Sequence, residues 1–144
     1  MSEPEEERGP PSRPRPDLTP FNEAFWTGGK DGGLRIQRCR ECDRWYHPPG
    51  ARCPRCLSGD LHYDAVSGRG EVFSFAVLHH AYRPGLVTPY VVALVELTDQ
   101  PGLRVTSNIV GCPASDVAIG MPVAVQFEAM GEGLYAPVFA PALR

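Results

Sequence analysis

The sequence of 144 residues contains one lysine, Lys30, and lacks any long apolar segment. A transmembrane helix needs a run of about 18 or more apolar residues, and no such run is present. The first 16 residues, MSEPEEERGPPSRPRP, also lack the apolar stretch of a secretory signal. These absences predict a cytoplasmic protein without membrane contact. In that compartment thiols stay reduced, and paired cysteines favour a metal over a disulfide.

Positive charge is scarce in the second half of the chain. Residues 70–144 contain three basic and six acidic residues, whereas residues 35–55 contain six arginines and two carboxylates. Because phosphate contacts supply most of the nonspecific affinity for nucleic acid, the second half is a poor candidate for that role. The 15 glycines and 16 prolines exceed one fifth of the chain and favour strands and turns over long helices.

Four of the five cysteines form two CxxC pairs separated by ten residues, in CRECDRWYHPPGARCPRC. Two such turns supply four thiolates, which is the ligand set of a closed structural zinc site. Since all four positions are taken, the metal would have a structural and not a catalytic role. The predicted ligands are Cys39, Cys42, Cys53 and Cys56.

Other interpretations of these cysteines remain open. The same ligand set binds iron in rubredoxin-like sites, and two local disulfides or free thiols are a further alternative. A redox CxxC pair is disfavoured by Pro54 and by the duplication of the motif. His47, between the pairs, could replace a cysteine ligand, although four thiolates make a packing role the simpler expectation.

The remaining sequence predicts a mostly β fold in two parts. Residues 1–16 are expected to form a disordered leader or linker, and residues 17–66 a short helix followed by a rubredoxin-like zinc ribbon. Residues 67–144 contain five β-rich stretches, EVFSFAVLHHA, PYVVALVEL, LRVTSNIV, MPVAVQFEAM and LYAPVFAPAL. Five short strands with one insertion, PASDVAIG, between the third and fourth predict a five-stranded OB-fold barrel.

The helix expected in TPFNEAFWTGG has a large aromatic face for its length. Thr19 fits an N-cap and Pro20 the first helical position, and Gly28 ends the helix. Its aromatic side chains either pack within the domain or form an interface with a partner chain. The predicted interface residues are Phe21, Phe25 and Trp26.

The order of several segments resembles that found in one protein family. These segments are FNEAFWTGG, LRIQRCRECDRWYHPPGARCPRC, SGRGEVFSF, YVVALVEL and IGMPV. The family comprises acyl-CoA-associated OB-fold proteins with an N-terminal zinc ribbon, and the resemblance runs from about residue 17 to the C-terminus. It implies a non-catalytic accessory subunit of a thiolase-fold acyl-CoA enzyme. Association with a MaoC-type enoyl-CoA hydratase is the alternative partner class. The leader RPRPDLTPFNEAFW resembles members whose thiolase-like partner performs a retro-aldol cleavage in steroid side-chain degradation.

On this hypothesis, the arginines of the ribbon could contact a phosphate of coenzyme A, because guanidinium binds phosphate through two parallel hydrogen bonds. They could equally face an acidic partner surface or remain solvated. The candidate residues are Arg38, Arg40, Arg44, Arg52 and Arg55.

Two other functions are compatible with parts of the sequence. Zinc ribbons and OB-folds also bind nucleic acids, and a fold does not fix a function. A stand-alone enzyme would have to use His79 and His80, with Tyr82 close by, at the end of the first barrel strand. Cys112 lies in an expected loop, and neither a neighbouring base nor electropositive surroundings are evident for it.

Overall fold

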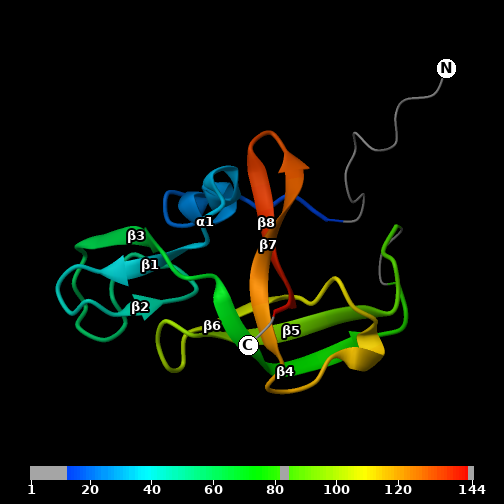
Figure 1. The fold of residues 1–144 in the computed structure, drawn as a ribbon. Coiled ribbons are helices and arrows are strands. Elements are labelled where there is room, and N and C mark those ends of the chain that lie inside the picture. The colour runs from blue at the N-terminus through cyan, green and yellow to red at the C-terminus, as the bar shows by residue number, and fades with distance from the viewer. Residues whose placement is uncertain (1–12, 82–84, 143–144) are drawn as a thin grey trace.

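The structure, a computed structural model, describes residues 13–81 and 85–142, and its regular structure is dominated by two antiparallel sheets. The predicted mostly β fold, a ribbon followed by an OB-fold barrel, is confirmed (Figure 1). Its elements are α1 (Glu23–Thr27), the 3₁₀ helix η2 (Gly28–Asp31), β1 (Arg35–Cys39), β2 (Trp45–Tyr46), β3 (Leu61–Ala65), β4 (Arg69–Leu78), β5 (Tyr90–Leu97), β6 (Arg104–Asn108), the 3₁₀ helix η3 (Ala114–Asp116), β7 (Pro122–Gly131) and β8 (Leu134–Pro141). No helix in these described ranges is long and apolar enough to cross a bilayer.

Part of the expected leader, residues 1–12, lies outside the described residues. The remainder of the leader runs along the β7–β8 hairpin. Arg13 forms an ion pair with Glu128 at 3.0 Å, and Arg15 forms one with Glu132 at 2.7 Å. These contacts fasten the end of the leader to the barrel.

The ribbon is a three-stranded sheet in the order β2-β1-β3. Its central strand buries Gln37, which is 4% exposed. The Gln37 amide donates to the carbonyl of Gly50 at 3.0 Å and accepts from the Gly50 amide at 2.7 Å. This pair of hydrogen bonds holds the Pro48-Pro49-Gly50 turn against the central strand.

The barrel is a five-stranded sheet in the order β6-β5-β4-β7-β8. A parallel bridge between Ile109 and Phe139 joins the segment after β6 to β8 and closes the sheet. In β5, alternate residues are buried, so that Val91, Ala93, Val95 and Leu97 face the barrel interior. The other residues of β5, among them Val92 and Leu94, face outward and are half-buried. The predicted insertion between the third and fourth strands contains η3, of only three residues.

One hydrophobic core runs through both parts. Leu34 and Ile36 from the ribbon belong to the same cluster of buried side chains as Val95 and Phe139 from the barrel. A second connection comes from the loop between β5 and β6. The Gln100 side chain accepts from the Trp45 amide at 3.0 Å and donates to its carbonyl at 2.9 Å. The ribbon is therefore attached to the barrel by shared packing and by the hydrogen bonds of the Gln100 side chain with the Trp45 backbone.

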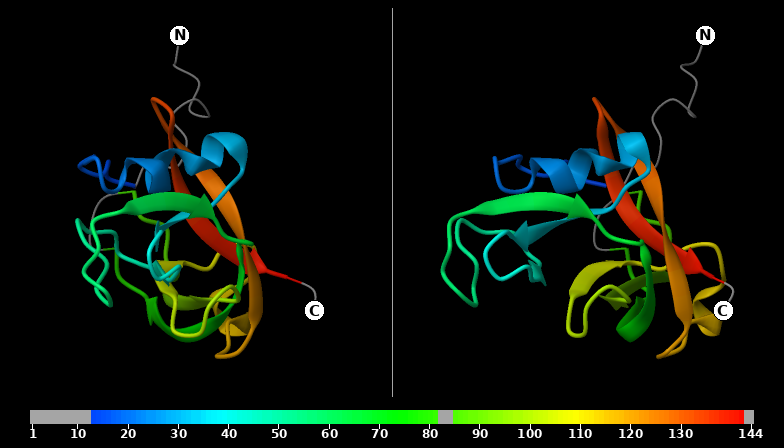
Figure 2. Two further views of the ribbon diagram at one scale, coloured as in Figure 1. Left: turned by 90° about the vertical axis from the view of Figure 1, so that its left-hand side faces the viewer. Right: turned by 60° about the vertical axis from the view of Figure 1, so that its left-hand side comes forward.

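The short helix lies across the β7–β8 hairpin in both views of Figure 2. A Cβ atom on Gly29 would lie 2.5 Å from Cβ of Tyr135, so only glycine permits this close approach. The Thr19 hydroxyl accepts from the amides of Phe21 and Asn22, both at 3.2 Å, and so caps the turn that precedes the helix, whereas the N-cap position of the α-helix itself is Asn22. The α-helix itself begins later than predicted, at Glu23.

Candidate functional site

The four paired cysteines converge at the tip of the ribbon. Their sulfur atoms all lie within 4.8 Å of one another, with 3.5 Å between the sulfurs of Cys39 and Cys56 and 3.6 Å between those of Cys42 and Cys53. In a tetrahedral ZnS₄ centre with Zn–S bonds of about 2.3 Å, sulfurs lie about 3.8 Å apart. The geometry therefore fits a metal ion with four thiolate ligands.

The two CxxC pairs reach this position through the same local structure. In the first, the Asp43 amide donates to the Cys39 carbonyl at 2.9 Å, and in the second Leu57 donates to Cys53 at 2.9 Å. The residue after each pair has a positive φ, 69° at Asp43 and 67° at Leu57. This repeated turn aims both sulfurs of each pair at a common point.

Backbone amides also point at the sulfurs. The amides of Arg55 and Cys56 lie 3.4 Å and 3.5 Å from the Cys53 sulfur, and the Cys42 amide lies 3.5 Å from that of Cys39. The amide of Cys56, followed by that of Arg55, lowers the pKa of Cys53 to about 6. Such hydrogen bonds favour the thiolate, which is the form that binds metal.

The short distances between the four sulfurs oppose the simultaneous ionisation of all four thiols. The amide of Ser58 acts to lower the pKa of Cys56, but burial and the three neighbouring sulfurs raise it to about 12. A divalent cation removes this repulsion, because it compensates the charge of the thiolates. The cluster thus offers four sulfur ligands to one metal ion.

His47 does not belong to the cluster of metal-binding groups, which among the described residues consists of the four cysteines. Its ring stacks on Phe25, with 4.9 Å between the ring centroids and 28° between the planes. Burial lowers the pKa of His47 to about 4. The imidazole is therefore a neutral packing group at neutral pH.

This burial predicts a pH dependence of folding stability. In the unfolded chain His47 takes up a proton near pH 6.5, whereas in the folded protein its pKa is about 4. The stabilisation from packing the neutral ring is therefore fully present above pH 6.5 and is lost as the pH falls toward 4. Between pH 7 and pH 5 we expect a loss of about 1–2 kcal/mol, reduced from the full linkage value because the ring is partly exposed. Urea unfolding of the metal-loaded wild type and of His47→Phe measures it. Equal slopes with pH in the two proteins would contradict the assignment.

The five arginines proposed to contact coenzyme A do not form one site. Arg38 stacks on Trp45, 4.4 Å from the ring centroid, and pairs with Asp43 and Asp64, both at 3.3 Å. The hydrogen bonds from His62 and Arg38 lower the pKa of Asp64. This arginine is therefore committed to the ribbon itself.

The other four arginines divide into two groups. Arg40 pairs with Asp60 at 3.2 Å, and Arg52 donates to the carbonyl of Leu57 at 3.1 Å. Arg44 and Arg55 line a cavity of about 340 Å³ between the ribbon and the β5–β6 loop. Within the described residues, neither of these two pairs with a carboxylate, and they remain candidates for an external contact.

The three aromatic residues proposed as an interface have different environments. Phe21 is 43% exposed and Trp26 is half-buried, whereas Phe25 is 7% exposed and belongs to the core. Phe25 stacks on His47 and meets Trp26 edge to face, with ring centroids 5.0 Å apart. Its side chain is therefore largely covered by its own chain, and a role for Phe25 at an interface stays a prediction.

A groove that the sequence did not reveal lies between α1, the turn at Pro48 and Pro49, and the outward face of β5 and β6. Its volume is about 540 Å³. We call it the junction groove, and its lining residues are Asn22, Phe25, Trp26, His47, Pro48, Pro49, Leu94, Arg104 and Thr106. The sequence contains one indication of this groove, the run PYVVALVEL. Its apolar residues on both faces indicate a strand that is covered on both sides.

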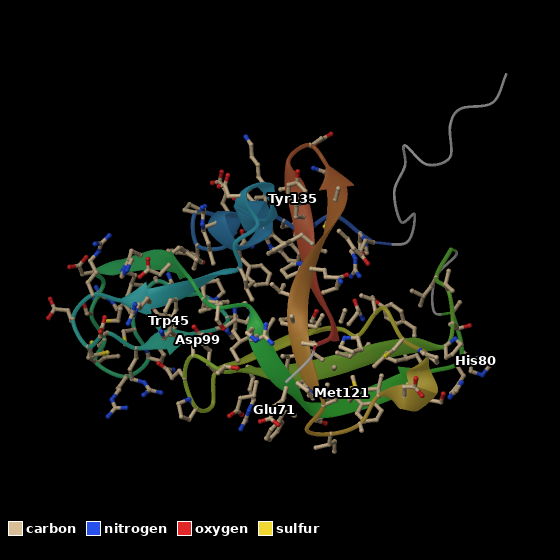
Figure 3. The ribbon with its side chains drawn as sticks, viewed as in Figure 1. Trp45, Glu71, His80, Asp99, Met121 and Tyr135 are labelled. Atoms are coloured by element: carbon tan, nitrogen blue, oxygen red, sulfur yellow. The ribbon has the colours of Figure 1, made fainter. Side chains whose placement is uncertain are left out.

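The residues proposed for a stand-alone enzyme lie elsewhere. His80 follows β4 at the end of the barrel far from Trp45 and the ribbon (Figure 3). Neither His79 nor His80 has a hydrogen bond or ion pair to another described side chain, and Tyr82 lies outside the described residues. Burial, followed by the charge of Asp116, raises the pKa of Cys112, which makes it a poor nucleophile.

Comparison with known proteins identifies both parts of the chain. Residues 26–62 match the rubredoxin-like zinc ribbon domain of ChsH2, and residues 63–128 match its C-terminal OB-fold domain. A solved structure titled Ltp2-ChsH2(DUF35) aldolase contains a chain 41% identical to this one. It superposes with a TM-score of 0.80 over 90% of this chain and 100% of that chain.

Curated relatives belong to several acyl-CoA enzymes. The probable enoyl-CoA hydratase alpha subunit of Thermomonospora curvata is 42% identical over 91% of this chain and 40% of its own length. The 3-oxo-4,17-pregnadiene-20-carboxyl-CoA hydratase alpha subunit of Mycobacterium tuberculosis is 40% identical over 79% of this chain and 36% of its own. This chain therefore spans less than half the length of either relative.

A shorter relative matches over more of its length. The benzoylsuccinyl-CoA thiolase subunit BbsA of Geobacter metallireducens is 33% identical over 67% of this chain and 65% of its own. The two domain matches together cover residues 26–128, and the similar solved chain covers 90% of this chain. The chain therefore belongs to the ChsH2 family, in which a rubredoxin-like zinc ribbon precedes a C-terminal OB-fold domain.

Proposed function

We propose that this chain is a non-catalytic accessory subunit that binds and activates a thiolase-fold acyl-CoA enzyme. The reaction we assign to the complex is a retro-aldol carbon–carbon cleavage in steroid side-chain degradation. The observation that carries the proposal is the similarity to the ChsH2(DUF35) chain of a solved aldolase, which this chain covers over 100% of its length. Relatives named as subunits of a benzoylsuccinyl-CoA thiolase and of a 3-oxo-4,17-pregnadiene-20-carboxyl-CoA hydratase support acyl-CoA thioesters as the substrate class, and the second name supports a steroid acyl group.

The chemistry of the described residues supports an accessory role. The metal centre has four sulfur ligands, so it offers no position for water or substrate. The described histidines at the end of β4 have no side-chain partner that could act as a base or orient them. The groups that perform the cleavage are therefore assigned to the partner.

A second candidate function is an accessory domain of a MaoC-type enoyl-CoA hydratase. The two hydratase alpha subunits favour it, because they are the relatives with 42% and 40% identity. Since this chain spans 40% and 36% of those subunits, the similarity concerns only part of each. Nucleic-acid binding has less support, because residues 70–144 contain six acidic residues against three basic ones.

The experiment is co-expression of this chain with three sets of partners. These are the Ltp2 chain of the solved aldolase, thiolase-fold proteins from the same genomic neighbourhood, and MaoC-type hydratases. Each pair is tested for co-purification, and each complex is assayed on steroid acyl-CoA thioesters. We expect a stable complex with an aldolase or thiolase-fold chain and cleavage activity that neither chain has alone. Activity of the isolated subunit, or a complex with hydratases only, would contradict the proposal.

We propose that the metal is zinc. When bound, it would link the two CxxC turns of the ribbon to each other. Purified protein is expected to contain about one zinc per chain, as measured by mass spectrometry of the metals, and to be colourless. The minority alternative is iron, for which the same four thiolates would give a coloured protein. Iron in place of zinc would overturn the metal assignment and leave the accessory role untouched.

A further inference from the structure

Two arginines of the ribbon line a cavity in which the described chain offers them no carboxylate. The cavity has a volume of about 340 Å³ and lies between the ribbon and the loop that joins β5 to β6. We call it the arginine cavity, and its lining includes Arg44, Arg55, Trp45, Tyr46, His47 and Gln100. None of its lining residues is an aspartate or a glutamate. Apart from the metal ligand Cys53, the two arginines are therefore its charged groups.

Arg44 and Arg55 differ in this respect from the other arginines of the ribbon. Arg38 pairs with two aspartates and Arg40 with a third, at 3.2–3.3 Å. The side chains of Arg44 and Arg55, by contrast, form no hydrogen bond or ion pair with any described residue. Arg44 is half-buried, and a charge at such a position attracts an anion more strongly than a fully solvated one does. All five N–H donors of each guanidinium are free for a ligand.

The walls of the arginine cavity are held in place by contacts within this chain. The Gln100 side chain forms hydrogen bonds with both backbone groups of Trp45, at 3.0 Å and 2.9 Å, and so fixes the β5–β6 loop against β2. Arg38 covers the Trp45 ring, 4.4 Å from its centroid. His47 stacks on Phe25. The cavity is thus formed before a ligand arrives, which lowers the free-energy cost of binding.

The chemistry of the lining specifies the kind of ligand. Two guanidinium groups without carboxylates select an anion, and their forked donors match the oxygens of a phosphate. The aromatic side chains of Trp45, Tyr46 and His47 add surface on which a purine base can stack. The volume of about 340 Å³ lies within the range of small-molecule sites. Together these features fit the phosphorylated adenosine of a nucleotide.

We propose that the arginine cavity binds the phosphorylated adenosine of a coenzyme A thioester, with Arg44 and Arg55 on the phosphate oxygens. The choice of coenzyme A among nucleotides rests on the proposed function, in which an acyl-CoA is the substrate. The phosphates are the anionic part of coenzyme A and lie at the end remote from the reacting thioester. The subunit therefore holds the non-reacting end of the substrate, and the partner acts on the acyl group. Of the five candidate arginines of the ribbon, this assignment retains two.

The test measures the binding of four probes by titration calorimetry, to the metal-loaded chain alone and in the complex obtained by co-expression. The probes are coenzyme A, adenosine 3′,5′-bisphosphate, pantetheine and pyrophosphate. Pantetheine lacks the phosphates and the adenosine, whereas pyrophosphate lacks the adenosine only. We expect the adenosine bisphosphate to bind within about 10-fold of coenzyme A and pyrophosphate at least about 10-fold more weakly, because it forgoes the base contacts. Pantetheine should show no binding.

Variants identify the groups that recognise the phosphates. Arg44→Gln and Arg55→Gln should each weaken coenzyme A binding by about 10-fold or more, the usual effect of losing a charge-assisted hydrogen bond. The matched control is Arg35→Gln, which removes the same charge from β1, where Arg35 pairs with Asp31 at 3.1 Å outside the cavity. It should bind within about threefold of the wild type. Metal content and thermal unfolding verify that each variant is folded.

Several results would overturn the inference and leave the proposed function standing, because complex formation and cleavage are measured separately. One is a wild type that binds no coenzyme A, alone or in the complex. Others are equal affinities for coenzyme A and either pantetheine, pyrophosphate or a single-stranded oligonucleotide, or folded arginine variants that bind as tightly as the wild type. Conversely, the expected pattern in a chain that forms no active complex would support the site and contradict the proposed function.

Discussion

Replacing Cys53 with serine is expected to release the metal and unfold the ribbon. Cys53 is 1% exposed and accepts hydrogen bonds from the amides of Arg55 and Cys56. A serine hydroxyl does not supply the thiolate that these groups stabilise. Because structural zinc contributes on the order of 10 kcal/mol of binding free energy to small metal domains, its loss exceeds what the ribbon can compensate. The metal content should fall from about one ion per chain to near zero.

The damage should extend into the barrel, because ribbon residues Leu34 and Ile36 belong to the same core as the barrel strands. We therefore expect aggregation or a broad thermal transition in the Cys53→Ser protein. The matched control is Cys112→Ser, which removes the cysteine outside the cluster and should keep the full metal content. A Cys53→Ser protein that stays monodisperse and still activates its partner would refute the structural role of the metal.

Replacing Phe25 with alanine is expected to destabilise the folded protein by about 3 kcal/mol, the range for truncating a buried aromatic side chain. The ring is 7% exposed and packs on both His47 and Trp26. Its loss leaves a cavity where the helix, the ribbon turn and the barrel meet. The free energy of unfolding in urea measures the effect.

Phe21 provides a matched control for this substitution. It is the same residue type four positions earlier, and its side chain is 43% exposed. Phe21→Ala should change stability by no more than about 0.5 kcal/mol, as is usual for exposed sites. Equal losses in the two variants would show that Phe25 does not have the core role assigned to it.

Local features were accessible from the sequence, because short segments determine them. Each CxxC turn closes through hydrogen bonds within a few residues, such as that from Asp43 to Cys39, so the spacing alone predicted the convergence of the sulfurs. The barrel strands were visible from their β-branched and aromatic residues between Gly and Pro. The two-residue strand β2 was missed, since it is too short to show any alternation.

Long-range contacts were not accessible in this way. The helix has five residues, which is too few for a periodic pattern to tell an inward Phe25 from an outward one. The ribbon arginines looked equivalent in the sequence, but Asp60 and Asp64, brought close by the pairing of β1 and β3, distinguish them. The junction groove combines α1, the Pro48 turn, β5 and β6, so no single stretch of sequence contains it.

The amide of Gln100 has a consequence for the behaviour of the free subunit. A short edge strand such as β2 normally exposes backbone groups to which a strand of another molecule can add, and this is a common route to aggregation. At Trp45 both the amide and the carbonyl are already occupied by the Gln100 side chain. The barrel thereby occupies the β2 edge of the ribbon at Trp45, so a strand of another molecule could not pair with the backbone there.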